Sequence, residues 1–128
     1  MLRPFLRAKI HRARVTRCDP DYEGSITIDA DLLAAADVLP LEKVEVYNVT
    51  RGSRFSTYAI AGTGGGGEIA LNGAAAHLGK VGDVVIIAAY ALLDREDLPS
   101  HRARVVLVDG GNRVLEVREQ TPFDLPDQ

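Results

Sequence analysis

The stretch VEVYNVTRGSRFSTYAIA, residues 44–61, decides the fold class of this 128-residue chain. Residues 44–49 and 54–61 alternate between apolar and polar side chains with the period of two that is typical of half-buried strands. The polar residues between them, 50–53, form a hairpin-type connection. This stretch therefore predicts two neighbouring strands in a mainly β protein.

Alternation also predicts which side chains share a face. In the second strand, one face is made of the polar residues Arg54, Ser56 and Tyr58. The opposite face is made of Phe55, Thr57 and Ala59. Residues 9–16 alternate in the same way, which predicts a strand with one shared face made of Lys9, His11, Ala13 and Val15.

Outside these runs, the sequence predicts more short strands and few helices. Asp29 or Asp31 can cap a short helix through Ala36 that stops before Pro40. One or two helical turns at residues 74–78 end at Gly79, and residues 63–67 form a Gly-rich hairpin tip. The further strands expected are residues 26–28, 68–71, 84–93, 104–108 and 113–117. Many short strands with evenly spaced turns favour a small barrel or sandwich.

Composition fits one globular domain with a single core, at 46% hydrophobic and 26% charged residues. The single cysteine, Cys18, excludes an internal disulfide framework and is interpreted as a small half-buried residue. The N-terminus lacks an apolar run long enough for a secretion signal, and no stretch approaches the ~20 apolar residues of a membrane span. We therefore expect a cytoplasmic protein without membrane contact.

The net charge of −3 hides an asymmetry between two parts of the chain. Residues 1–24 hold six Lys/Arg against three Asp/Glu, whereas residues 25–128 hold nine against fifteen. A basic arm can mark a nucleic-acid footprint. We favour a basic strand lying against an acidic body, because the basic residues also alternate as in a strand.

General catalytic motifs are missing from the sequence. It has no nucleotide fingerprint, no His/Glu metal spacing and no Gly-x-Ser-x-Gly elbow. Its three histidines are dispersed, at His11, His77 and His101. Residue patterns alone therefore lead only to a β domain with a cluster of polar strand residues.

Six blocks, in order and with matching gaps, resemble the signature of the bacterial aspartate 1-decarboxylases. They are KIHR (9–12), YEGS (22–25), NVT (48–50), RFSTYAI (54–60), NGAAAH (72–77) and VGDVVII (81–87). The resemblance spans about residues 1–93. It implies a closed six-stranded double-psi β-barrel over residues 1–118, followed by a loose polar tail at 119–128.

The resemblance implies that the chain makes its own cofactor from Ser25. Self-cleavage of the Gly24-Ser25 bond would give residues 1–24 (the β chain) and 25–128 (the α chain), with a covalently bound pyruvoyl group at position 25. Gly24, which lacks a Cβ, suits the strained backbone of the cyclic step. Neither pyridoxal phosphate nor a metal is expected.

The implied reaction is decarboxylation of L-aspartate to β-alanine and CO2, which serves pantothenate and coenzyme A synthesis. The substrate would be held as a Schiff base on the pyruvoyl group. The implied assembly is a homotetramer of processed subunits. The sequence leaves open whether cleavage is spontaneous or needs a maturation factor, as it does in some relatives.

Site roles follow from the resemblance, position by position. Thr57 would assist the cleavage and Tyr58 would donate the proton. Arg54 would grip the side-chain carboxylate as a bidentate fork, with Lys9 adding positive charge. The residues expected to line the pocket or position the substrate are His11, Tyr22, Tyr47, Asn72, Gly73, Ala74 and Ala75.

Two other functions are kept as alternatives. A small β-barrel could bind nucleic acid through its basic arm, although few aromatic residues are present for base stacking. A barrel of the same ancestry could also serve, without cleavage, as an interaction module.

Overall fold

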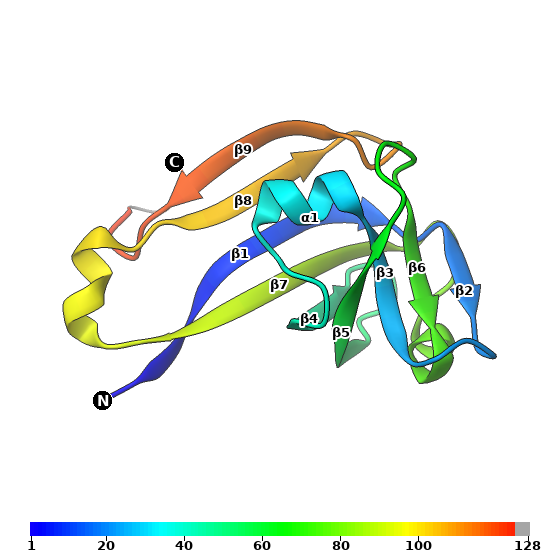
Figure 1. The fold of residues 1–128 in the computed structure, drawn as a ribbon, viewed down its shortest axis with the longest axis horizontal. Helices are drawn as coiled ribbons and strands as arrows, with labels where there is room; N and C mark the ends of the chain where they lie inside the picture. Colours follow the sequence, from blue (N-terminus) through cyan, green and yellow to red (C-terminus); the bar gives the residue numbers. More distant parts are fainter. Residues whose placement is uncertain (125–128) are drawn as a thin grey trace.

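The structure, a computed structural model, describes residues 1–124, which form nine strands and three short helices (Figure 1). The strands are β1 (Arg3–Arg14), β2 (Arg17–Asp19), β3 (Ser25–Asp29), β4 (Lys43–Asn48), β5 (Arg54–Gly62), β6 (Ile69–Asn72), β7 (Val84–Leu93), β8 (Ala103–Val108) and β9 (Val114–Gln120). The helices are α1 (Ala30–Ala36) and the 3-10 helices η1 (Gly73–Leu78) and η2 (Arg95–Ser100). The mainly β prediction and the hairpin at residues 44–61 are confirmed, whereas β2 and η2 lie outside the predicted elements.

All the strands join one sheet in the order β2-β6-β3-β5-β4-β7-β1-β8-β9. The N-terminal strand β1 lies inside this order, antiparallel to β7 and parallel to β8, as Figure 1 shows. The parallel pair β3 and β5 brings the start of β3 beside the middle of β5. These two pairings position the candidate site.

The prediction of a closed six-stranded barrel is wrong, because the strand pairing in residues 1–124 does not close the sheet. The edge strands there are β2 and β9, each paired with a single neighbour, so the sheet stays open. β2 has only three residues, and all seven residues of β9 are exposed. These two edge strands do not pair with each other. The double-psi arrangement stays a prediction. β9 continues to Gln120, past the expected domain boundary at 118, and the last part of the expected tail, 125–128, lies outside the described residues.

A register shift in β1 corrects the predicted shared face of that strand. Arg12 has a φ of 61°, and the pairing of β1 with β7 slips between Ile10 and Ala13. This irregularity changes the phase of the alternation. Ala13 is buried with Ile10, so Lys9 and His11, which are only half-buried, lie on the opposite face from Ala13.

The apolar core confirms the alternation predicted for β5. Ala59 is fully buried and Phe55 packs against the core, while Arg54 and Ser56 are exposed. Burial of the Val, Ile and Leu side chains supplies the main driving force, at about 25 cal/mol per Å² of apolar surface. One face of β5 therefore belongs to the core, and the other face carries its polar side chains.

The carboxylate of Asp29 joins the helix start to the Gly-rich loop. Asp29 is the N-cap of α1 and accepts a hydrogen bond from the Asp31 N–H at 2.7 Å, which confirms one of the two predicted caps. It also accepts from the Gly67 N–H at 2.6 Å. Burial alone would raise the pKa of Asp29, but these backbone donors lower it below its ordinary value. α1 ends at Ala36 because Asp37 adopts the left-handed conformation, three residues before Pro40.

Basic residues near the N-terminus pair with acids of the body. Arg7 Nη2 forms an ion pair with Glu42, and Arg17 Nη2 lies 3.2 Å from Glu68 Oε2. These contacts support the interpretation of a basic strand against an acidic body. Within residues 1–124, no helix is long and apolar enough to cross a membrane.

Candidate functional site

Ser25, the first residue of β3, is held by contacts on two sides. Its side chain is 1% exposed, and its Oγ donates a hydrogen bond to the Glu23 carbonyl at 3.2 Å. Antiparallel pairing of β3 with β6 places Asn72 directly opposite Ser25. Asn72 Nδ2 donates to Ser25 Oγ at 3.0 Å and to Thr27 Oγ1 at 2.9 Å. The hydroxyl of Ser25 is therefore buried and fixed beside the Gly24-Ser25 bond.

Asn72 also holds an unused acceptor in this buried site. The residue is fully buried, and its Oδ1 has no hydrogen-bond partner among the described residues. A buried amide oxygen without a partner costs about 1–3 kcal/mol. Nearly all buried polar groups in proteins have a partner, so the unpaired Asn72 Oδ1 is an acceptor available to a ligand or a reacting group.

A close steric contact in this structure lies at Gly73, the first residue of η1, whereas the role predicted for Gly24 in the cyclic step stays a prediction. Gly73 has a φ of +64°, and a Cβ there would lie 2.7 Å from Gly24 Cα and 2.9 Å from the Tyr22 carbonyl oxygen. A Cβ on Gly24 would meet no heavy atom within 4 Å. The segment before Ser25 can therefore pack against η1 only because residue 73 is glycine.

Thr57 and Tyr58 lie on the strand next to Ser25. In the parallel pair, Ile26 is the partner of Ala59. Tyr58 and Thr57 are the residues of β5 that come just before this first paired position, as Ser25 and Gly24 come just before Ile26. Both side chains are half-buried, and within residues 1–124 neither hydrogen bonds to Ser25. An extension of the pairing by one or two residues would bring them level with the Gly24-Ser25 bond.

The basic residues of the predicted pocket share one sheet face but are separated. Lys9 of β1 is the partner of Ala88, Ala88 of Glu45, and Glu45 of Ser56, which is two residues from Arg54. β1 and β5 are thus three strand spacings apart, roughly 14 Å at ~4.8 Å per spacing. Arg54 and Tyr58 share one face of β5, as predicted. Lys9 lies on the same face of the sheet but three strands away, on β1.

Other predicted pocket residues take varied places. His11 is half-buried and has no partner on Nδ1 within residues 1–124, and burial, followed by the charges of Lys9 and Arg12, lowers its pKa. Tyr22 is 52% exposed in the turn before Ser25. In η1, Ala74 is exposed and Ala75 is buried.

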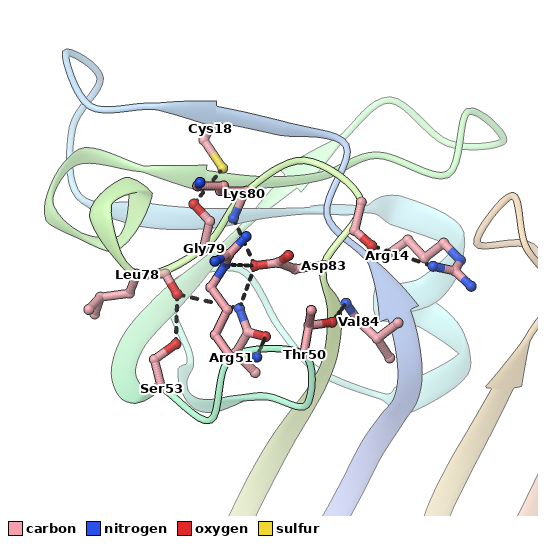
Figure 2. Close-up of polar contacts among 12 residues, drawn as sticks. Arg14, Cys18, Thr50, Arg51, Ser53, Leu78, Gly79, Lys80, Asp83 and Val84 are labelled. Atoms are coloured by element: carbon pink, nitrogen blue, oxygen red, sulfur yellow. Dashed lines mark hydrogen bonds and ion pairs between the residues drawn. The ribbon is translucent and has the colours of Figure 1, made fainter.

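Asp83 anchors the far end of η1, as Figure 2 shows. Its Oδ2 accepts from Arg51 Nε at 2.6 Å, from Asn48 Nδ2 at 2.9 Å and from the Lys80 N–H at 2.9 Å. The last residue of η1, Leu78, accepts at its carbonyl from Ser53 Oγ at 2.7 Å. This network ties η1, whose first residue packs on Gly24, to the β4–β5 hairpin.

Sequence patterns did not identify the Asp83 network. Asp83 was visible only as part of a Gly-Asp turn before β7, and its side-chain partners Asn48 and Arg51 come from the β4–β5 hairpin, more than 30 residues away in the chain. Cys18 lies beside the same network, with its Sγ 3.5 Å from the Gly79 carbonyl oxygen. It is half-buried, as predicted, and burial followed by the charge of Asp83 raises its pKa.

Asp83→Ala should lower the free energy of unfolding by about 2–3 kcal/mol, because it leaves the buried Asn48 amide and the partly buried donors of Arg51 and Lys80 without this acceptor. Asp83→Asn should cost less, since it keeps an acceptor and loses only the charge. The measurement is urea unfolding, with the exposed Asp21→Ala as a matched control that should change stability by less than about 0.5 kcal/mol. Equal stabilities of Asp83→Ala and the control would contradict this prediction.

Acidification should remove the stabilisation that the Asp83 carboxylate contributes. Burial alone would raise the pKa of Asp83, but the donors from Asn48, Lys80 and Arg51 lower it below its ordinary value of 3.8. A lowered pKa means stabilisation that is present above that ordinary value and lost as the pH falls through the folded-state value. The stability gap between wild type and Asp83→Ala should therefore narrow below about pH 4. A gap that stays constant through that range would contradict the assignment.

The candidate site offers a buried hydroxyl, amide groups and a polar strand face. Such groups can take part in acyl and proton transfer. Within residues 1–124, no three His, Cys, Asp or Glu side chains come together in a group that could hold a metal ion.

Comparison with known proteins points the same way. Residues 1–115 match the aspartate decarboxylase family. An aspartate 1-decarboxylase of Syntrophobacter fumaroxidans is 56% identical over 115 residues, covering 90% of this chain and 93% of that protein. One of Ralstonia pickettii is 54% identical over 119 residues, covering 93% and 99%. One of Myxococcus xanthus is 52% identical over 115 residues, covering 90% and 88%. The chain belongs to the aspartate decarboxylase family.

Proposed function

We propose that this chain is a self-cleaving precursor of an enzyme that decarboxylates L-aspartate to β-alanine and CO2. The observation that supports it best is the buried hydroxyl of Ser25, which lies between the Glu23 carbonyl and the Asn72 amide at the start of β3. The family and its named relatives support the substrate. β-Alanine would then supply pantothenate and coenzyme A synthesis.

The proposed cleavage uses groups already present around Ser25. Attack of its Oγ on the Gly24 carbonyl carbon forms a C–O bond and breaks the C–N bond, which leaves an ester and a free amine on residue 25. Loss of the Cα proton and of the Cβ–O bond then releases Gly24 as a carboxylate. Water finally displaces the nitrogen as ammonia and leaves the pyruvoyl carbonyl.

Neighbouring groups would assist this sequence. The Thr57 hydroxyl would donate a hydrogen bond to the Gly24 carbonyl oxygen as charge develops on it. The free Asn72 Oδ1 would accept from the amine that the acyl shift exposes. The residues around Ser25 therefore fit a cofactor that is built in place.

Substrate handling would fall to the polar face of β5. The chemistry that the new ketone supplies is condensation with an amine and acceptance of the electrons left by departing CO2. Arg54 would bind the side-chain carboxylate as a bidentate fork, and Lys9 would raise the local positive potential. Tyr58 would donate a proton to the α-carbon through its Oη.

Intact mass under denaturing conditions tests the proposal. We expect two species, residues 1–24 and 25–128, together with β-alanine formed from L-aspartate. Residues 1–24 include β1, which is hydrogen-bonded to both β7 and β8. Gel filtration should therefore show a single oligomer, which we propose is a tetramer, while denaturing gels show two bands. An intact chain after prolonged incubation, with no β-alanine, would overturn the proposal. Separation of the two fragments under native conditions would contradict the expectation that β1 stays bound to β7 and β8 after cleavage.

A further inference from the structure

Two tyrosines form a hydroxyl pair beside Arg54 on the outer sheet face. Tyr47 lies on β4 and Tyr90 on β7, and their hydroxyl oxygens are 2.7 Å apart. Tyr47 is also the cross-strand partner of Arg54, whose Cζ lies 4.3 Å from the centre of the Tyr47 ring. A guanidinium at this distance over an aromatic face is attracted by the ring quadrupole.

The pair adds no negative charge of its own beside Arg54, although the Glu45 carboxylate also acts on Tyr90. Burial, followed by the hydrogen bond with Tyr47, raises the pKa of Tyr90 to about 12. The phenol therefore stays protonated and neutral in the range where enzymes work. A carboxylate in the same position would hold Arg54 more firmly, but it would also neutralise the charge that a substrate carboxylate must meet.

The hydroxyl pair also restrains the ring beneath Arg54. Tyr47 is half-buried and Tyr90 is 42% exposed, so neither ring is fixed by packing on all sides. The bond between the two hydroxyls joins neighbouring strands and keeps the face of Tyr47 under the guanidinium. A planar fork that is held in one orientation loses less entropy when it binds a carboxylate.

We propose that Tyr90 is a positioning residue that acts through Tyr47 to orient Arg54 toward the side-chain carboxylate of the substrate. This rests on the proposed function, in which Arg54 binds that carboxylate. Tyr90 would contribute to selection of a dicarboxylate and would not touch the bond that breaks.

Tyr90→Phe tests the role because it removes one oxygen and keeps the ring. We expect KM for L-aspartate to rise about three- to tenfold with kcat within about twofold, the size of a weakened cation–π and fork contact. Tyr47→Phe should give a similar rise, and the double variant Tyr47→Phe/Tyr90→Phe should give no further rise, because both single changes break one bond. The remote hydroxyl deletion Ser100→Ala should leave KM unchanged. An unchanged KM in Tyr90→Phe, additive effects in the double variant, or a loss confined to kcat would overturn the proposal.

A second readout separates this proposal from the proposed function. Succinate has two carboxylates and no amine, so its binding by calorimetry does not require the ketone. Its dissociation constant should rise by a similar factor in Tyr90→Phe, whether or not the chain has been cleaved. If the wild type stays uncleaved and shows no turnover, the proposed function is wrong, whereas the positioning role of Tyr90 is still judged by succinate binding. If wild type and Tyr90→Phe bind succinate with equal affinity, the positioning role of Tyr90 is wrong, whereas the proposed function is unaffected.

Discussion

Ser25→Ala should remain one 128-residue chain and should form no β-alanine from L-aspartate. The Ser25 hydroxyl is the nucleophile next to the Gly24 carbonyl along the chain, and it is buried with fixed partners. An alanine provides neither the attacking oxygen nor the leaving group for the later elimination. We therefore expect cleavage and turnover to fall below detection, rather than by a modest factor.

Two measurements check this result. Intact mass should show a single species for Ser25→Ala, where the wild type shows two, and circular dichroism should show that the fold is kept. Ser100→Ala is the matched control, because among residues 1–124 its hydroxyl bonds only to the Asp97 carbonyl, within η2, which has no buried residue. Cleavage of Ser25→Ala at the same bond would rule out Ser25 as the nucleophile. A wild type that is also uncleaved would favour the interaction-module alternative.

Gly73→Ala should be the second most damaging single change. A left-handed φ costs a non-glycine residue about 1–2 kcal/mol, and the new Cβ would lie 2.7 Å from Gly24 Cα. Relief of that clash costs a further 1–3 kcal/mol or so. Since Gly24 holds the carbonyl under attack, a shift of about 1 Å there should slow cleavage by about 100-fold.

Gly65→Ala is a control that separates backbone strain from the clash. Its φ of +89° carries a similar conformational cost, yet no heavy atom lies within 4 Å of a Cβ at that position. We expect Gly65→Ala to lower the melting temperature and to cleave at the wild-type rate. The time course of the two bands gives the cleavage rate, and thermal unfolding gives the stability of each variant. Equal cleavage rates for Gly73→Ala and Gly65→Ala would show that the approach of Gly24 to η1 is unimportant.

Local sequence patterns predicted the strands better than their arrangement. The alternation in residues 44–61 predicted β4, β5 and the face shared by Arg54 and Tyr58, because burial of one sheet face imposes a period of two. The same rule failed in β1, where the left-handed Arg12 and a register shift changed the phase after Ile10. A bulge of this kind is specified by pairing with β7, which the local pattern does not contain.

The site shows the same division. Resemblance named Ser25, Asn72 and Gly73 as members of the site, but only the register of β3 and β6 placed the Asn72 amide on the Ser25 hydroxyl. The Tyr47–Tyr90 pair joins residues 43 positions apart, so no local spacing could indicate it.

The sequence by itself determined the mainly β class, the strands with strong alternation, the short helix that begins near Asp29 and, through its six blocks, the family. These are properties of short segments, in which backbone period, capping and turn chemistry act within a few residues. The tertiary structure alone decided the open strand order, the contact of Gly73 with Gly24, the Asp83 network and the separation of Lys9 from Arg54. Those features depend on which distant strands pair and in which register, and pairing is fixed by the packing of the whole core.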